Sequence, residues 1–186
     1  SGYSANLGVF SALRDEIDWV LQDKFNHASL IDGNRLIGFP VQRYLHNNLE
    51  SLEKKLKKQA GTGLIVTDNV FSMDGDRANI DGIKTISAQS GALLMQDDAH
   101  GFGTLGKTGA GAGEEQGVQD NIDVYFATFA KSLASTGAFI AADKEIIDYL
   151  KYNLRSQMFA KSLQMQLVVG ALKRLEMLRT MPELKD

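Results

Sequence analysis

Residues 124–132, Val-Tyr-Phe-Ala-Thr-Phe-Ala-Lys-Ser, carry the strongest structural signal in this chain. They form a short apolar run, rich in residues that favour strands, which stops at Lys131 and continues into small and polar residues. Such a run is typical of a buried strand in a parallel sheet. Ligands of open α/β sheets bind at the carboxyl ends of the strands. Lys131 is therefore either a solvated charge in a loop or an amine held over a ligand.

A second strand end adds an acid and a histidine. Residues 92–100 form another apolar run, and this one closes on Asp97, Asp98 and His100. Successive side chains of a strand point to opposite faces, so only one of the two aspartates can face a ligand. A lysine, an acid and a site for a phosphate are what pyridoxal phosphate chemistry requires. The phosphate site is expected at Gly2, where a predicted helix begins with free backbone N–H groups.

The order of predicted elements indicates the fold class. Strands alternate with helices, which predicts a doubly wound α/β domain with a mostly parallel sheet flanked by helices. No internal repeat is present. The expected strands are 17–22, 39–45, 64–67, 92–97, 124–131 and 138–142. The expected helices begin near residue 2 and span 27–33 (broken at Gly33), 48–60 and 80–89, and residues 145–178 are expected to be mostly helical.

Composition excludes several classes of protein. The net charge of −3 offers no basic excess for nucleic acid, and the lysines at 54–58 lie on the solvated face of an amphipathic helix. No apolar run approaches the roughly 18 residues of a membrane span, so no transmembrane segment is expected. The chain has no cysteine, which excludes disulfides and fits a cytoplasmic location.

Two other kinds of site, a nucleotide-phosphate loop and a metal site, are compatible with residues in and after the 92–100 run. Residues Gly101–Thr108 match the phosphate-loop pattern G-x-x-x-x-G-K-[ST], which would make this a nucleotide-phosphate-binding domain. That alternative requires a helix opening at Gly106 or Lys107, whereas further glycines up to Gly113 predict a mobile loop over a site. A metal held by Asp97, Asp98 and His100 is disfavoured because adjacent strand residues diverge, and we expect no metal site.

Several motifs occur together in one order along the whole chain. This order resembles the α-oxoamine synthases, which are pyridoxal-phosphate enzymes of fold type I and share the large domain of aspartate aminotransferase. The motifs that carry the resemblance are Asn26-His-Ala-Ser29 with Asp32-Gly33, His46-Asn47, Val70-Phe-Ser-Met-Asp-Gly-Asp76, Asp97-Asp-Ala-His100 and Thr128-Phe-Ala-Lys-Ser132.

The resemblance implies four catalytic residues. Lys131 would form the Schiff base and act as the base that removes the α-proton. Asp97 would pair with the pyridine nitrogen and keep the ring cationic. His27 would stack on the ring and help orient the carboxylate of the amino acid, and His100 would hydrogen-bond the phenolic oxygen. His46 is expected to be an ordinary core histidine.

The resemblance also implies further contacts to the cofactor. Ser72 would share the phenolic oxygen with His100, and Thr128 would bind the phosphate. Gly2 and Tyr3 would bind the same phosphate through backbone N–H groups at the helix start.

The implied reaction condenses an amino acid with an acyl-CoA, releasing CoA and CO₂. The residues around Lys131 are most similar to bacterial serine palmitoyltransferases of sphingolipid biosynthesis, so L-serine and a long-chain acyl-CoA are the expected substrates. The alternatives are 2-amino-3-ketobutyrate CoA ligase, which uses glycine and acetyl-CoA, and 8-amino-7-oxononanoate synthase. Family members are homodimers about twice this long. Residues 1–186 are therefore expected to be the large domain, without the N-terminal segment and C-terminal domain, and inactive alone.

Overall fold

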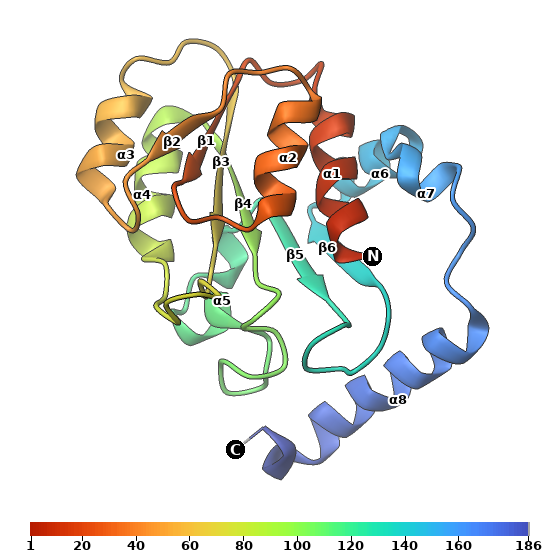
Figure 1. The fold of residues 1–186 in the computed structure, drawn as a ribbon. Helices are drawn as coiled ribbons and strands as arrows, with labels where there is room; N and C mark the ends of the chain where they lie inside the picture. Colours follow the sequence, from red (N-terminus) through yellow and green to blue (C-terminus); the bar gives the residue numbers. More distant parts are fainter. Residues whose placement is uncertain (186) are drawn as a thin grey trace.

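Six strands form one sheet in this computed structural model, which describes residues 1–185 (Figure 1). The strand order is β2-β1-β3-β4-β5-β6; β1 to β5 are parallel, and β6 runs antiparallel to β5 at one edge. The predicted mostly parallel α/β sheet is confirmed. The strands are β1 (Trp19–Asp23), β2 (Gln42–Tyr44), β3 (Gly63–Asp68), β4 (Leu93–Asp97), β5 (Val124–Thr128) and β6 (Ala138–Ala142).

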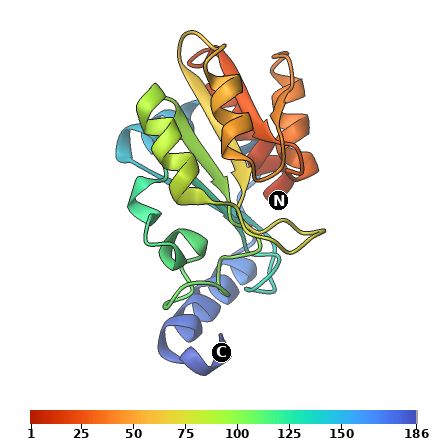
Figure 2. The ribbon, with the colours of Figure 1, turned by 90° about the vertical axis from the view of Figure 1, so that its left-hand side faces the viewer.

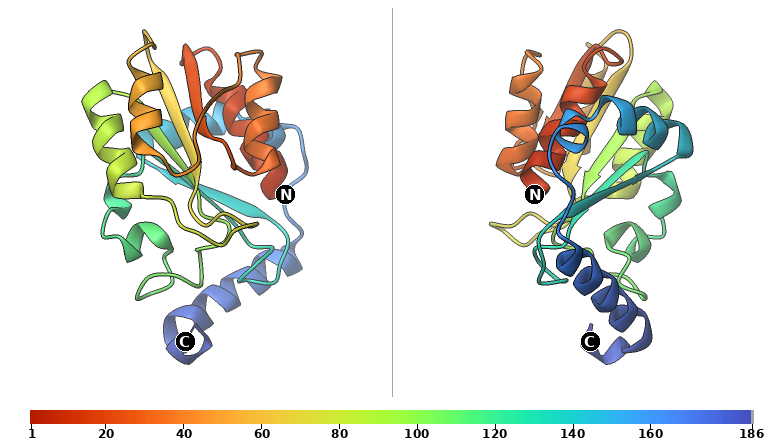
Figure 3. Two further views of the ribbon diagram at one scale, coloured as in Figure 1. Left: turned by 60° about the vertical axis from the view of Figure 1, so that its left-hand side comes forward. Right: turned by 90° about the vertical axis from the view of Figure 1, so that its right-hand side faces the viewer.

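Helices cover both faces of the sheet (Figures 2 and 3). On one face α1 packs against α2, α6 and α7, and on the other α3 packs against α4. No helix in the described part of the chain is long and apolar enough to cross a membrane. The helices are α1 (Gly2–Leu13), α2 (Ala28–Leu36), α3 (Leu49–Leu56), α4 (Ile80–Ser90), α5 (Ala112–Glu115), α6 (Lys144–Asn153), α7 (Arg155–Met158) and α8 (Met165–Thr180), with short 3₁₀ turns at Gln119–Asn121 and Pro182–Leu184.

The alternation of side chains along the central strands makes two cores. Val66 and Met95 face α1 and α2, whereas Ile65 and Leu94 face α3 and α4. All four are fully buried. Strands covered on both faces need apolar residues at successive positions, and for this reason these strands have continuous apolar runs.

The first helix begins where the sequence predicts. Ser1 is its N-cap, and the Ser1 hydroxyl accepts the backbone N–H of Ser4 at 3.3 Å. The start of α1 lies beside the carboxyl end of β5 (Figure 1). The N–H groups in the first turn of a helix have no partner within the helix.

Several predicted boundaries differ from those in the structure. The strand that precedes Lys131 ends at Thr128, so Lys131 lies in the loop that follows. The region predicted to be mostly helical, 145–178, consists of three helices, and the last of them, α8, lies beyond the carboxyl edge of the sheet (Figure 1). The predicted helix break at Gly33 is absent, because α2 continues to Leu36.

Packing explains the glycine at position 33. A Cβ atom added to Gly33 would lie only 2.4 Å from Cδ2 of Phe10, a fully buried residue of α1. Gly33 therefore lets α1 and α2 approach each other, and its role is close packing rather than helix termination.

We predict that Gly33→Ala lowers the free energy of unfolding by about 1–3 kcal/mol, since the added methyl group overpacks Phe10. Gly170→Ala is the matched control within a helix. Its Cβ would meet only the flexible end of Arg174, so it should be neutral or stabilise by up to about 1 kcal/mol. Chemical denaturation measures both. Equal stability of the two variants would contradict this account.

Candidate active site

A cleft of about 200 Å³ opens where β3, β4 and β5 end. The first turn of α1 and the start of α2 form its other walls. The residues that line it are Gly2, Tyr3, Asn6, His27, Ser29, Asp68, Asp97, Ala99, His100, Phe126, Thr128, Ala130 and Lys131.

Lys131 and His100 form a pair at the mouth of the cleft. The Lys131 Nζ donates to His100 Nε2 at 2.8 Å. Burial lowers the pKa of Lys131, although the nearby Asp97 and Asp68 oppose this. Burial, followed by the charge of Lys131, lowers the pKa of His100. The lowered pKa of His100 favours a neutral imidazole, whose Nε2 accepts the hydrogen bond from Lys131. The lowered pKa of Lys131 means that its amine loses a proton more easily than a surface lysine does.

Two buried carboxylates face the cleft from neighbouring strands. Asp68 and Asp97 are register partners at the ends of β3 and β4, and they are 4% and 6% exposed. Burial raises the pKa of both. Hydrogen bonds from the Ala99 N–H (3.0 Å) and the Asn6 amide (2.8 Å) oppose this rise at Asp97 and stabilise its ionised form.

Asp98 points away from the cleft, as the strand alternation predicts. Its carboxylate accepts from Asn69 at 2.6 Å, from the Tyr125 hydroxyl at 2.9 Å and from the Ala112 N–H at 3.1 Å. Burial raises the pKa of Asp98 to about 6, although these hydrogen bonds oppose the rise. Since Asp98 and Asp97 diverge, they cannot join His100 around one metal ion.

The start of α1 forms a narrow corner beside β5. A Cβ atom on Gly2 would lie 3.1 Å from Phe126 and 3.4 Å from the Thr128 hydroxyl oxygen. The Thr128 hydroxyl donates to the Gly137 carbonyl at 3.0 Å and accepts from the Ala130 N–H at 3.2 Å. Backbone N–H groups at a helix start next to a residue without a side chain suit an anion.

The structure brings seven of the eight predicted site residues into this cleft: Gly2, Tyr3, His27, Asp97, His100, Thr128 and Lys131. Ser72 is the exception. It is exposed in the loop after Phe71 and does not line the cleft. Ser72 lies in the turn that the Val70–Arg77 bridge closes, and its contact to the phenolic oxygen stays a prediction.

Asn6, Ser29 and Asp68 also line the cleft but were not predicted as site residues. Asp68 carries the same signal as Asp97, an acid at the end of an apolar strand, and the sequence could have identified it. Asn6 and Ser29 sit on helices, and only the packing of α1 against α2 brings them together.

The loop after β4 does not have the structure of a phosphate loop. The first helix after it is α5, which begins at Ala112, so no helix opens at Gly106 or Lys107. The alternative of nucleotide binding at Gly101–Thr108 is therefore wrong, because the helix that a phosphate loop requires is missing there. Gly111 has φ +103°, and its Cβ would lie 1.8 Å from an Asp98 oxygen, which requires glycine at this position.

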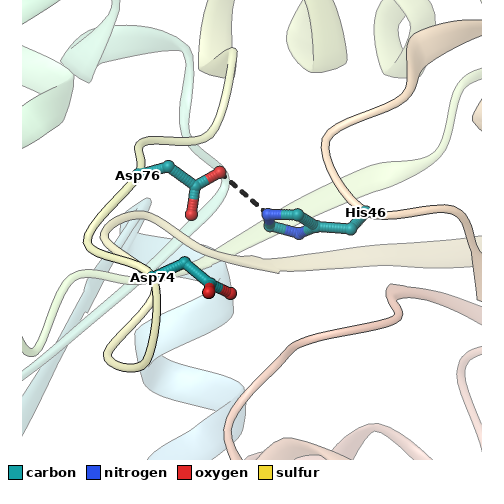
Figure 4. Close-up of side chains that lie close together, drawn as sticks. All are labelled: His46, Asp74 and Asp76. Carbon is teal, nitrogen blue, oxygen red and sulfur yellow. Dashed lines mark hydrogen bonds and ion pairs between the residues drawn. The ribbon is translucent and has the colours of Figure 1, made fainter.

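His46 lies outside the cleft with two acids of the Val70–Arg77 turn (Figure 4). One ligand atom from each of His46, Asp74 and Asp76 falls within 4.8 Å of the others. The ring nitrogens are already engaged, Nε2 with Asp76 at 2.8 Å and Nδ1 with Asp23 at 2.9 Å. Burial lowers the pKa of His46, but these two hydrogen bonds outweigh it and raise the pKa. His46 thus forms ion pairs with Asp23 and Asp76, and the expectation of an ordinary core histidine is refined accordingly.

Comparison with known proteins shows the family of this chain. A family model described as aminotransferase class I and II matches residues 1–185. A cysteate-C-fatty acyltransferase of Capnocytophaga ochracea is 49% identical over 100% of this chain and 46% of that protein. An 8-amino-7-oxononanoate synthase of Citrifermentans bemidjiense is 45% identical over 100% of this chain and 48% of that protein.

A solved structure agrees with these matches. The serine palmitoyltransferase of S. paucimobilis with a bound PLP–myriocin aldimine superimposes with a TM-score of 0.92 and 31% identity, over 98% of this chain and 46% of that one. The chain therefore spans about half the length of the relatives that it matches.

Proposed function

The chain belongs to the aminotransferase class I and II family, and we propose that it is the cofactor-binding large domain of a pyridoxal-5′-phosphate-dependent α-oxoamine synthase. One juxtaposition carries the proposal: Lys131 and the buried Asp97 line the same cleft as the start of α1. An amine, a carboxylate and an anion site in one cleft are the groups that pyridoxal phosphate requires.

The residues of the cleft fit that cofactor. Asp97 is buried and receives two hydrogen bonds that favour its charge, as the partner of a protonated ring nitrogen must be. The corner at Gly2 and Thr128 suits a phosphate, because a side chain at position 2 would fill it. Lys131 lines the cleft and has a lowered pKa, which suits an amine that reacts with an aldehyde.

The cofactor supplies, when bound, an aldehyde carbon and a ring that withdraws electrons from the α-carbon of an amino acid. The chain supplies the groups around it. Lys131 holds or accepts a proton at Nζ, and the contact with His100 keeps Nζ directed into the cleft. Asp97 places a fixed negative charge at the floor of the cleft, and its burial strengthens the interaction with a cation there.

We propose an amino acid and an acyl-CoA as substrates, with loss of CoA and CO₂. L-Serine with a long-chain acyl donor is the first candidate pair. The names of a fatty acyltransferase and a serine palmitoyltransferase among the similar proteins support the long chain. The 49% identity to the cysteate enzyme makes L-cysteate a second acceptor. The 45% identity to an 8-amino-7-oxononanoate synthase keeps that activity as the alternative.

We further propose that the protein works as a homodimer in the cytoplasm. Apolar side chains are exposed at the carboxyl edge, including Met73 at 92% and Leu172 at 61%, and a second subunit would cover them. The absence of cysteine suits a reducing compartment.

Lys131 is predicted to be the residue that pyridoxal phosphate modifies. Incubation with the cofactor, borohydride treatment and peptide mapping should locate the label on Lys131. Labelling should persist to lower pH than labelling of surface lysines, because the lowered pKa leaves more neutral amine. Lys131→Arg should abolish the label, and Lys107→Arg should retain it. A label on Lys107, or one spread over surface lysines, would refute the assignment.

Asp97→Asn should weaken cofactor binding, whereas Asp98→Asn should lower thermal stability. Asp97→Asn removes a charge-assisted hydrogen bond to the ring nitrogen, worth roughly 1.5–3 kcal/mol, and should weaken cofactor affinity about 10- to 100-fold. Asp98→Asn should leave affinity nearly unchanged but lower the melting temperature, since Asp98 holds three donors outside the cleft. Absorbance titration and thermal unfolding measure the two effects. Similar losses of affinity would contradict the assignment of Asp97.

A substrate panel tests the proposed reaction. The panel is run on the full-length parent, of which we propose that this chain is the large domain. CoA release should be fastest with L-serine and palmitoyl-CoA among combinations of serine, cysteate, glycine and alanine with palmitoyl-, pimeloyl- and acetyl-CoA. Preference for alanine and pimeloyl-CoA would assign the alternative activity, and glycine with acetyl-CoA would assign the ketobutyrate ligase. Preference for cysteate with palmitoyl-CoA would leave the proposed acyl donor unchanged and make cysteate, in place of L-serine, the amino acid substrate.

A further inference from the structure

A chain of buried hydrogen bonds runs from Asp97 to the ring of His27. The Asn6 amide nitrogen donates to Asp97 Oδ2 at 2.8 Å and to Ser29 Oγ at 2.9 Å. Ser29 Oγ lies 2.8 Å from His27 Nδ1. Asn6 and Ser29 are each 1% exposed, so water cannot replace either of them.

The backbone of α2 decides where the proton on His27 lies. The Ser29 backbone N–H donates to His27 Nδ1 at 3.3 Å, with His27 as the N-cap of α2. A backbone N–H can only donate, so Nδ1 must accept and carries no hydrogen. The remaining hydrogen of a neutral His27 ring is therefore on Nε2.

The side chains agree with that assignment. The ionised Asp97 carboxylate can only accept, which orients the Asn6 amide with its nitrogen toward Asp97. Both hydrogens of that nitrogen are used, one on Asp97 and one on Ser29. Ser29 Oγ then gives its own hydrogen to His27 Nδ1, and every hydrogen in the chain has an acceptor.

We propose that Asn6 and Ser29 are positioning residues that hold His27 as the neutral Nε2–H tautomer and direct this single donor into the cleft. His27 Nε2 makes no hydrogen bond to any residue that the structure describes, and it is free for an acceptor atom of a ligand. The identity of that ligand rests on the proposed function, but the tautomer does not.

The arrangement also couples His27 to the charge of Asp97. A neutral group at position 97 that offers an N–H to Asn6 would turn the Asn6 amide, and Ser29 would lose its donor. The charge of Asp97 therefore affects the tautomer of the His27 ring through Asn6 on α1 and Ser29 on α2.

Nitrogen-15 NMR of the histidine rings in the cofactor-free protein tests the proposal. Under conditions in which the ring is neutral, His27 should show the shift pair of the Nε2–H tautomer. The signal is assigned by its loss in His27→Gln. The Nδ1–H tautomer in the unaltered protein, or an equal mixture of the two, would overturn the proposal without any variant being made.

Variants test the residues separately. Ser29→Ala removes one hydrogen bond to Nδ1 and should move the tautomer ratio toward Nδ1–H by about 2- to 12-fold. Ser29→Thr keeps the hydroxyl and should restore the ratio. Ser87→Ala removes an equally buried hydroxyl far from His27, where it donates to the Lys84 carbonyl, and should not change the ratio. An unchanged ratio in a folded Ser29→Ala protein would refute the role of Ser29.

Asp97→Asn should shift the tautomer ratio of His27 before any cofactor is added, and Ser87→Ala should not.

Cofactor binding separates this proposal from the proposed function. If pyridoxal phosphate fails to bind the unaltered protein while the tautomer is as expected, the proposed function fails and the positioning role stands. If the cofactor binds and His27 is an equal mixture, the positioning role fails alone.

Discussion

The charge of Asp97 is the constraint on which the cleft depends. A carboxylate that is 6% exposed loses most of its hydration, and its ionised form persists only where donors and cations replace water. The Ala99 N–H, the Asn6 amide and the nearby Lys131 ammonium provide this replacement. Each comes from a different part of the chain, so the charge can be accommodated only after the sheet and α1 have assembled.

The packing of α1 on α2 is part of the same requirement. Gly33 allows α2 to approach Phe10 of α1, and this close contact brings Ser29 within 2.9 Å of Asn6. A bulkier residue at position 33 would separate the helices and lengthen that hydrogen bond. Stability of the core and geometry of the cleft therefore depend on one helix contact.

The second aspartate of the pair has a structural role of equal weight. Asp98 accepts from β5 through Tyr125 and from the start of α5 through Ala112, and the glycine-rich loop wraps around it. The position of Gly111, within contact distance of the Asp98 carboxylate, accounts for glycine in that loop without any nucleotide. Gly101, the first glycine of the phosphate-loop pattern, also packs on this carboxylate, since its Cβ would lie 2.1 Å from an Asp98 oxygen. Packing around a buried charge therefore accounts for that glycine of the pattern.

The sequence by itself determined the alternation of strands and helices, the divergence of Asp97 and Asp98, and the meeting of Lys131, Asp97 and His100 at one sheet edge. These follow from local periodicity and from the rule that parallel strands share their carboxyl ends. Only the tertiary structure decided that Gly33 lies inside a helix, that Asn6 and Ser29 belong to the cleft and that Ser72 does not line it. Those outcomes depend on which helices approach each other and on the path of a turn, and the contacts that decide them join residues far apart in the sequence.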